Sequence, residues 1–358
     1  MMGKMLRFSL FGESHGKALG VLVEGVPPGI KVDIGKMKAE LERRRGIERF
    51  STKRKEKDEP VILSGVFNGF TTGSPIAVII ENRDVDSSYY EKIKNTPRPG
   101  HGDYTAGIRY FGFNDYRGGG FFSGRLTAGM VIAGYFAKEI LSKAGIGVKA
   151  YIKSIGNVKA KDLSVEEIFS SKLCPDEEAF QKMLEEMERA RNEGDSVGGV
   201  VEVIAINVPP GIGGPYDEDL EGELAKAFFA IPAVKGVEFG LGFRIAELRG
   251  SEANDSFVIK DGKIMTKTNN CGGILGGISN GMPIVARIAF KPVPSIYKPQ
   301  RTVDVVRMEE IEIKLTGRFD SCIVPKALPV VEAMMAFVLA DHLLRWLGWK
   351  GFMSLGKR

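Results

Sequence analysis

Apolar and polar residues alternate along the chain with two different periods, which predicts strands interleaved with helices. Residues 7–12 (RFSLFG) and 19–26 (LGVLVEGV) have the short apolar runs of strands, and a Pro-Pro-Gly sequence ends the second run. Asp33 can cap a helix that runs to about Arg45, because apolar residues then recur on one face. Residues 61–82 predict a β-hairpin that alternates on both sides of a Gly/Thr turn.

The rest of the chain continues this mixture. Helices are expected at 125–143, 175–193 and 327–347, strands at 146–158 and 198–207, and a hairpin at Asp261-Gly262. The stretches GVLVEGVPPG and GGVVEVIAINVPPG both run from a strand into Pro-Pro-Gly before a helix, which hints at an internal duplication. Since no linker rich in Pro, Ser or Gly divides the chain, we expect an α/β (α+β) fold in which residues 1–358 form a single domain.

Composition narrows the class of protein. Of the 358 residues, 43% are hydrophobic and 27% are charged, as in a soluble globular protein. The net charge of +5 suits an anionic small molecule and is too small to indicate a nucleic-acid partner. Three cysteines lie far apart without CxxC spacing, so we expect no metal site and no disulfides, but reduced thiols in the cytoplasm. The N-terminus lacks the apolar run of a signal peptide, and four polar residues interrupt the most apolar stretch, which argues against a membrane span.

Two of the three histidines lie in glycine-flanked polar loops. His15 stands in LFGESHGKALG, where Gly12 and Gly16 either let a ligand approach the backbone or form a sharp turn. His101 stands between two glycines in NTPRPGHGDYT. Because imidazole changes its charge near neutral pH, both histidines are candidate acid–base groups. His342 has helical spacing from apolar residues and is interpreted as a packing or interface residue.

Arginines and glycine-rich loops accompany these histidines. Arg43, Arg44 and Arg45 follow one another in a helix, where successive side chains point about 100° apart, so at most two of them can meet one ligand. The run DYRGGGFFSGRLTAG precedes a helix and offers backbone N–H groups to an anion, although it is neither a P-loop nor a dinucleotide fingerprint. The run NNCGGILGGISNG is either a loop for close approach of a flat ligand or a structural turn.

One carboxylate completes this set of candidate groups. Arg318 and Asp320 in TGRFDSC point the same way if this segment is extended. Such an arginine keeps the carboxylate ionised and able to act as a base, and a simple ion pair is the alternative. Two histidines, this carboxylate, many arginines and no metal or nucleophile motif together indicate an acid–base enzyme that acts on a multiply anionic substrate.

The motifs taken together, in their order, resemble the chorismate synthase family. They are FGESHGKALG, VEGVPPG, RRRGIERFSTKRKE, ILSGVFNGFTTGSPI, RPGHGDYT, DYRGGG, AVKGVEFG, GGILGGISNG and GRFDSC, and they cover nearly the whole chain. The resemblance implies a single-domain β-α-β sandwich that assembles as a homotetramer. It implies an anti-1,4 elimination of phosphate from 5-enolpyruvylshikimate 3-phosphate to give chorismate in the shikimate pathway. It also implies a requirement for reduced FMN without net redox change.

The resemblance also implies roles for individual residues. His15, with Ser14 beside it, matches the histidine at the departing phosphate, and His101 matches the one that protonates the reduced flavin. Asp320 matches the carboxylate that helps flavin N5 to remove the proton at C6. The substrate-binding positions are Arg44, Arg49, Arg98, Arg125 and Arg318. The flavin-binding positions are Ser123, Ala233, Gly276, Lys291, Ser295 and Arg318.

This chain departs from the family pattern at several flavin-binding stretches. Phe121, Phe122 and Leu126 stand where many members have polar residues, and Pro232 stands where an asparagine is common. Val293 and Pro294 replace the usual Thr-Ser, so the affinity for the flavin phosphate is expected to differ. NADPH would be needed only if the protein reduced its own flavin. No added reductase domain is readable, which favours an external flavin reductase as partner.

Two other hypotheses remain open from the sequence. A flavin oxidoreductase would use the same FMN site but would need a nicotinamide fingerprint, and none is readable. An RNA-binding module built on RRRGIERFSTKRKEK would need aromatic residues among its basic ones, and only one is present. Within that stretch, residues 53–57 are expected to form a solvated loop.

Overall fold

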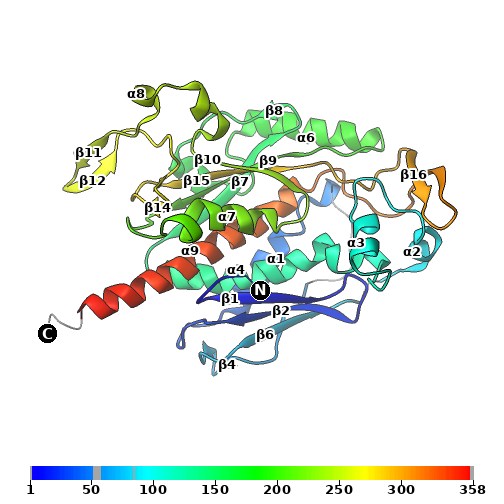
Figure 1. Ribbon diagram of the computed structural model, residues 1–358, viewed down its shortest axis with the longest axis horizontal. Helices are drawn as coiled ribbons and strands as arrows, with labels where there is room; N and C mark the ends of the chain where they lie inside the picture. Colours follow the sequence, from blue (N-terminus) through cyan, green and yellow to red (C-terminus); the bar gives the residue numbers. More distant parts are fainter. Residues whose placement is uncertain (1, 51–57, 84, 355–358) are drawn as a thin grey trace.

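Two antiparallel β-sheets enclose a layer of helices in the computed structural model, which describes residues 2–50, 58–83 and 85–354 (Figure 1). The first sheet has the order β1-β2-β6-β3, formed by Arg7–Gly12, Ala18–Glu24, Ile76–Glu81 and Val61–Ile62. The second has the order β10-β15-β9-β7-β8, formed by Val234–Phe239, Ile284–Phe290, Gly199–Ile206, Gly147–Ile155 and Val158–Lys159. This sandwich confirms the expected α/β (α+β) class.

Four helices lie between the sheets (Figure 1). They are α1 (Ile34–Arg43), α4 (Thr127–Ser142), α7 (Leu220–Phe229) and α9 (Val324–Ser354). Helix α5 (Val165–Ser170) covers the outer face of the second sheet, and α6 (Glu177–Asn192) packs against β7 and β8. The connections contain α2 (Ser88–Ile93), α3 (Asp103–Arg109), α8 (Gly250–Ala253) and four small hairpins. These hairpins pair β4 (Val66–Phe67) with β5 (Phe70–Thr71), β11 (Phe257–Lys260) with β12 (Lys263–Thr266), β13 (Ile274–Leu275) with β14 (Ile278–Ser279), and β16 (Gln300–Asp304) with β17 (Glu309–Ile313).

The two halves of the chain repeat one topology. In the first half β1, β2, α1, β3, β6 and α4 follow one another, and in the second half β7, β9, α7, β10, β15 and α9 do. The sheet orders β1-β2-β6-β3 and β7-β9-β15-β10 correspond strand for strand, and every pairing is antiparallel. The two Pro-Pro-Gly sequences therefore occupy equivalent positions, after β2 and after β9. This arrangement agrees with the duplication hinted at by the sequence.

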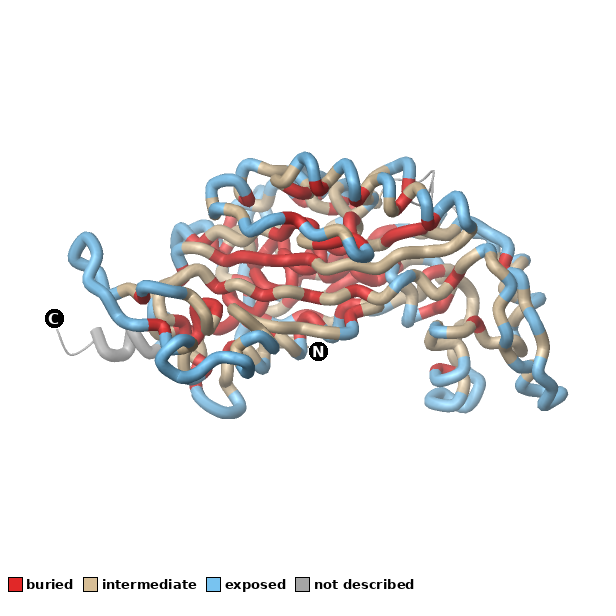
Figure 2. Tube along the Cα trace, turned by 90° about the horizontal axis from the view of Figure 1, so that it is seen from above, coloured by how far each residue is buried: buried red, intermediate tan, exposed pale blue. Residues whose placement is uncertain are grey.

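The core is continuous from one sheet to the other. Buried residues run through the middle of the molecule, where the central strands and the inner helices meet (Figure 2). Helices α4 and α9 pack closely because Gly134 faces Ala333; a Cβ on Gly134 would lie 2.2 Å from the Cβ of Ala333. Burial of apolar side chains at about 25 cal/mol per Å² is the main stabilisation of such a core.

Several element boundaries differ from the sequence predictions. The hairpin at 61–82 is nested, since β3 pairs with β6 while β4 pairs with β5. Its tight turn is Asn68-Gly69, both with positive φ, and the predicted Gly/Thr turn is wrong because Thr71 belongs to β5. Helix α4 begins at Thr127, since Gly118, Gly119 and Gly120 have positive φ and only a 3₁₀ turn, Gly124–Leu126, precedes it.

Helix α9 is long and apolar enough to cross a membrane, with a hydropathy of 1.7 over Val324–Gly348. Ninety-four per cent of that window is buried inside the protein, as in the core helix of a globular fold. His342 lies on this helix and is 4% exposed, which agrees with its interpretation as a packing residue. Among the described side chains, its Nε2 atom has no hydrogen-bond partner.

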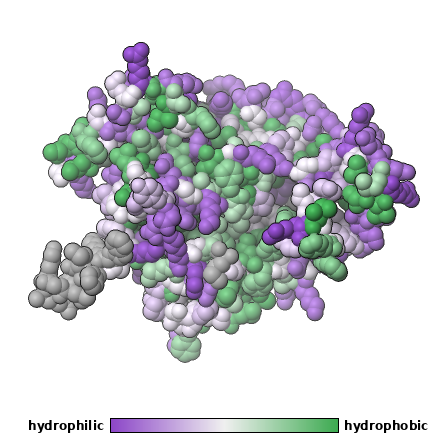
Figure 3. Space-filling view, viewed as in Figure 1, coloured by the Kyte–Doolittle hydropathy of each residue, from purple (hydrophilic) through white to green (hydrophobic). Residues whose placement is uncertain are grey.

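Apolar side chains are also exposed on projecting segments. The β11–β12 hairpin carries Phe257, Ile259 and Ile264, all more than two-thirds exposed, and forms one of the apolar areas at the left of Figure 3. The register of the hairpin pairs Ile259 with Ile264, so these side chains lie on one face. Phe111 and Phe113, just after α3, are still more exposed. Groups of this kind often mark contacts with a partner.

Candidate active site

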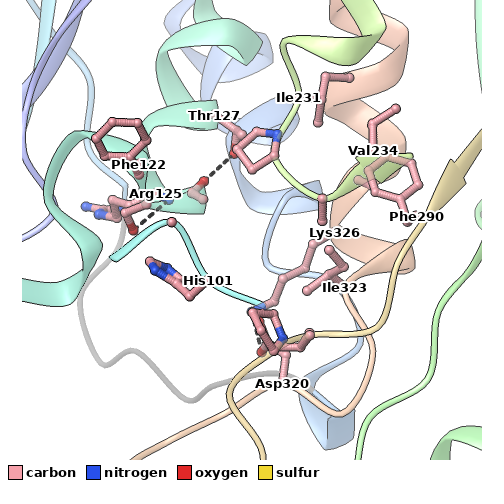
Figure 4. Close-up of a pocket in the computed structure, with 18 of the residues that line it drawn as sticks. His101, Phe122, Arg125, Thr127, Ile231, Val234, Phe290, Asp320, Ile323 and Lys326 are labelled. Carbon is pink, nitrogen blue, oxygen red and sulfur yellow. Dashed lines mark hydrogen bonds and ion pairs between the residues drawn. The ribbon is translucent and has the colours of Figure 1, made fainter. Parts of the chain in front are cut away.

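A cavity of about 780 Å³ opens where the two halves of the chain meet (Figure 4). The first half contributes Arg44 and Arg45 at the end of α1, and the loops 98–102 and 118–127. The second half contributes residues 229–235 after α7, residues 290–295 after β15, and the start of α9. Segments far apart in the sequence therefore meet in one concave site, as is common for ligand sites.

The three successive arginines of α1 point in different directions, as predicted. Arg43 donates two 2.7 Å hydrogen bonds to the buried carboxylate of Glu332. Arg44 and Arg45 line the cavity. Arg45 also donates to Glu42 at 2.9 Å. Two of the three arginines thus face the cavity, which agrees with the prediction that at most two can meet one ligand.

Arg44 and Arg125 share one carboxylate in the cavity wall. Arg44 NH2 lies 2.6 Å from Asp58 Oδ2, and Arg125 pairs with Asp58 Oδ1. Arg125 is only 5% exposed, so its charge needs a partner in the absence of solvent. Burial would raise the pKa of Asp58, but the two arginines outweigh burial and hold that pKa at about 2. Asp58 was not predicted as a site residue, because it follows a charged run that resembles a solvated loop.

His101 lies in a compact charged loop on the same side of the cavity. Its Nδ1 atom lies 2.6 Å from Asp103 Oδ1, and Arg98 binds the same carboxylate through Nε at 2.7 Å and NH2 at 2.8 Å. Burial would raise the pKa of Asp103, but hydrogen bonds from Arg98 and His101 lower it far below its usual range. Lys291, also predicted, donates from Nζ to the carbonyl of Gly100. Asp103 was missed from the sequence, although its spacing from Arg98 and His101 was a usable signal.

His15 and Ser14 lie one layer behind the cavity wall. A Cβ on Gly118, which lines the cavity, would lie 2.3 Å from His15 Cδ2 and 3.0 Å from Ser14 Oγ. The His15 Nδ1 atom is 2.9 Å from Ser87 Oγ. Gly12 has positive φ, and a Cβ there would lie 2.3 Å from the carbonyl oxygen of Ala18. Gly12 therefore serves the sharp turn of β1–β2, and Gly118 is the glycine that makes room for the His15 ring behind the wall.

Asp320 lines the opposite side of the cavity, at the entry to α9. Lys326 Nζ, from the first turn of that helix, lies 2.7 Å from Asp320 Oδ1. Arg318 is exposed and does not line the cavity. The cation that accompanies Asp320 in the cavity wall is thus Lys326, which the sequence analysis did not name. In the sequence Lys326 directly precedes an apolar helical stretch, and nothing in that pattern indicates a site residue.

Most predicted flavin-binding positions line this cavity as well. Ser123, Ala233, Lys291 and Ser295 belong to its wall, together with the divergent Phe121, Phe122, Pro232, Val293 and Pro294. Gly276 lies outside it, in the turn between β13 and β14. Arg49 also lies outside, 65% exposed and 3.0 Å from Glu188. The basic run 53–57 lies beyond the described residues.

The cavity has one apolar wall and several cations, a combination that suits a flat aromatic ligand together with an anionic one. The apolar wall consists of Ile231, Val234, Phe290, Ile323 and Val330, and Phe122 lines the cavity on the other side (Figure 4). The cations around it are Arg44, Arg45, Arg98, Arg125, Lys235, Lys291 and Lys326. No group of three or more His, Cys, Asp and Glu side chains in the described ranges could hold a metal ion. Fold and site together define an acid–base enzyme for a multiply anionic substrate.

Comparison with known proteins specifies this class. The family model for chorismate synthase matches residues 6–344. A chorismate synthase of Thermococcus gammatolerans is 70% identical over 98% of this chain and 99% of its own length. One of Thermococcus kodakarensis is also 70% identical, over 99% of this chain and 100% of its own. A chorismate synthase crystal structure at 36% identity matches with a TM-score of 0.77, over 97% of this chain and 94% of that one.

The chain therefore belongs to the chorismate synthase family, and its activity is that of a carbon–oxygen lyase of the shikimate pathway. The resemblance stated from the motifs is confirmed.

Proposed function

We propose that phosphate leaves 5-enolpyruvylshikimate 3-phosphate in the cavity, by anti-1,4 elimination, to give chorismate. The observation that carries this proposal is the convergence of cations and acid–base groups around one apolar wall. Phosphate is a poor leaving group unless its charge is met, and preorganised arginines meet it without reorganisation. Arg44, Arg98 and Arg125 lie in the wall and are proposed to bind the phosphate and carboxylates of the substrate.

Arg49 and Arg318 are proposed to act at the rim of the cavity. Arg49 follows the lining residue Arg45 by four positions, and Arg318 precedes Asp320 by two. Long, flexible guanidinium side chains at such positions can reach an anion that lies at the opening.

His15, His101 and Asp320 are proposed as the groups that move protons. His15, with Ser14, is proposed to act on the departing phosphate from directly behind Gly118, where any side chain would meet the ring. His101 holds a proton at the cofactor side of the cavity. Asp320 would help the bound flavin to remove the proton at C6, and Lys326 compensates the charge of this carboxylate. Each proton transfer of this kind contributes typically about 10²- to 10⁴-fold in rate.

Reduced FMN is the proposed cofactor, and NADPH is needed only if the protein reduces its own flavin; otherwise a separate flavin reductase is the partner. The cavity fits FMN, since its apolar wall suits a flat ring and its lysines suit a phosphate. Ser123, Ala233, Lys291 and Ser295 of the cavity wall would hold it, and the family also implies Gly276 and Arg318, which lie outside that wall. When bound, reduced FMN supplies electron density to the allylic system and leaves no net redox change.

Assembly and location complete the proposal. We propose a homotetramer in the cytoplasm, with residues 1–358 as one domain. The exposed apolar face of the β11–β12 hairpin (Figure 3) supports a contact between copies, and the core shared by both halves supports one domain.

An anaerobic assay tests the reaction. Enzyme, 5-enolpyruvylshikimate 3-phosphate and dithionite-reduced FMN are mixed, and chorismate absorbance and free phosphate are followed together. We expect equal amounts of both, none with oxidised FMN, and large losses in His15→Ala, His101→Ala and Asp320→Asn. Absence of product from folded, FMN-binding protein would contradict the proposal. Folded protein that binds no FMN would exclude the cofactor site.

A further inference from the structure

The loop that carries His101 is organised around a single buried carboxylate. Asp103 accepts from Arg98 at three atoms, namely the backbone N at 3.1 Å, Nε at 2.7 Å and NH2 at 2.8 Å. Its Oδ1 atom is also 2.6 Å from His101 Nδ1. The carboxylate thus closes the turn from 98 to 103 and touches the imidazole at one defined nitrogen.

In the hydrogen bond between His101 Nδ1 and Asp103 Oδ1, the imidazole is the donor. Asp103 is ionised under ordinary conditions, because the hydrogen bonds that it receives lower its pKa. An ionised carboxylate can only accept, so the proton between the two groups belongs to His101 Nδ1. In the neutral ring, Nε2 then carries the lone pair and is the atom that exchanges a proton.

The ring is also confined on its other sides. Arg98 NH2 lies 3.1 Å from Nδ1 and 3.3 Å from Nε2, so the guanidinium lies against the imidazole. A Cβ on Gly119 would lie 3.1 Å from His101 Cε1, which places the backbone of the triple-glycine loop next to the ring. Lys291 binds the carbonyl of Gly100, directly before His101.

We propose that Asp103 is a positioning residue that holds His101 with Nδ1 protonated, so that Nε2 is the atom that exchanges protons in the cavity. The proposal rests on the function proposed for His101. Asp103 itself does not line the cavity, whereas His101 does, so Asp103 is placed to act through the imidazole. A carboxylate that fixes the tautomer and orientation of a histidine is a recurring device in acid–base enzymes.

Histidine-selective ¹⁵N labelling measures the tautomer directly. The chain has three histidines, so three imidazoles contribute signals. The signal that is absent from His101→Ala belongs to His101. In magic-angle-spinning NMR of the sedimented full-length protein, we expect His101 to be protonated at Nδ1. In Asp103→Asn, whose amide can donate to Nδ1, we expect Nε2–H instead. A wild-type ring protonated at Nε2 overturns the proposal.

Turnover in the anaerobic assay supplies the second measurement. We expect Asp103→Asn to lower kcat about 10- to 100-fold, and Asp103→Glu to recover part of it. If Asp103 acts through His101, then Asp103→Asn has less than about a twofold effect in the His101→Ala background. A loss that persists undiminished in that background overturns the positioning role and assigns the effect to Arg98 or to folding.

Controls separate this proposal from the proposed function. Asp341→Asn removes another buried carboxylate that binds an arginine and backbone N–H groups, but on α9 and outside the cavity wall. We expect it to change stability while the tautomer of His101 stays at Nδ1–H. If His101→Ala keeps the wild-type kcat, the role proposed for His101 fails, and the NMR measurement still decides whether Asp103 sets the tautomer.

Discussion

Two neighbouring arginines at the end of α1 belong to two different charged clusters. Arg43 points inward to Glu332, which also accepts from Lys138 at 2.8 Å and from the backbone N of Ala150 at 3.0 Å. Arg44 points to Asp58 in the cavity wall, where Arg125 is the second partner. Both clusters set a carboxylate between two cations, and in the core cluster Glu40 also pairs with Arg43 and Lys138. They differ in what surrounds them.

The difference in surroundings decides what each cluster can do. Glu332 is 1% exposed and binds Arg43 on α1, Lys138 on α4 and the backbone of β7, so it links these elements within the core. Asp58 faces a cavity of about 780 Å³, so its arginines can turn to a ligand. The same ion-pair chemistry therefore fixes helices in one place and presents cations in the other.

Removal of the core carboxylate should have the largest effect. Glu332→Ala leaves Arg43 and Lys138 without their buried partner, and we expect a loss of about 3–5 kcal/mol in the free energy of unfolding. Denaturant titration measures it. A loss below about 1 kcal/mol would show that the cluster does not hold the helices.

The pH dependence of the same cluster has a definite window. The Lys138 and Arg43 charges outweigh burial and lower the pKa of Glu332 to about 2, from 4.5. The stabilisation is therefore complete above pH 4.5 and is lost as the pH falls towards 2.

A buried histidine should produce the second-largest effect, at a higher pH. Burial is the main cause that lowers the pKa of His342 to about 4, from 6.5, and Arg345 adds to it against Asp341 and Glu218. Between pH 6.5 and 4 the unfolded chain binds a proton that the folded protein does not. Stability should thus fall by about 3 kcal/mol as the pH decreases through this range. Denaturant titration gives the free energy of unfolding at pH 7 and at pH 4. In His342→Gln the difference between these two values should be about 3 kcal/mol smaller than in the wild type. An equal difference in both proteins would contradict the assignment to His342.

Substitution in the cavity cluster should affect activity rather than stability. Arg44→Ala removes one charge-assisted hydrogen-bond donor, and we expect kcat/KM to fall by about 10- to 100-fold, since such bonds contribute about 1.5–3 kcal/mol. Because Arg125 still pairs with Asp58, the loss in the free energy of unfolding should be smaller than in Glu332→Ala. Arg7→Ala, which removes a surface arginine 3.6 Å from Glu24, is the matched control and should change neither. If kcat/KM fell equally in Arg44→Ala and Arg7→Ala, the result would contradict the assignment of Arg44 to the site.

The smallest effect concerns anion binding. Asp58→Asn leaves Arg44 and the buried Arg125 without their shared carboxylate. Inorganic phosphate should therefore bind several-fold more tightly, which corresponds to about 1 kcal/mol of binding free energy. Thermal shifts at increasing phosphate concentration measure this affinity. The matched control is Glu40→Gln, a carboxylate paired with Arg43 and Lys138 away from the cavity, which should leave the affinity unchanged. An equal gain in the control would place the phosphate elsewhere.

Much of the fold could be predicted because its signals are local. The cap at Asp33 is present, since its side chain accepts from the backbone N of Lys36. The hairpin at Asp261-Gly262 and the helix near 175–193 also form as predicted. The start of α4 was misplaced at Arg125, because helical periodicity does not register that three preceding glycines have positive φ.

The site was only partly predictable. His101, Asp320 and four of the arginine and lysine positions stood out by motif and line the cavity. No motif indicated three further site residues, because only their partners in the folded chain show their role. They are Asp58, Asp103 and Lys326. Arg49 and Gly276, implied by the family, lie outside the cavity wall of the single chain.

By itself, the sequence determined the class of fold, the repeated strand–Pro-Pro-Gly–helix pattern and the family, because all three depend on residue types at short spacing. Only the tertiary structure decided that Arg43 stabilises the core while Arg44 faces the cavity. Their partners, Glu332 and Asp58, lie 289 and 14 residues away, and no periodicity relates those positions. Whether an ion pair faces the cavity, and so can meet a ligand, is a property of the packed chain and not of any segment of it.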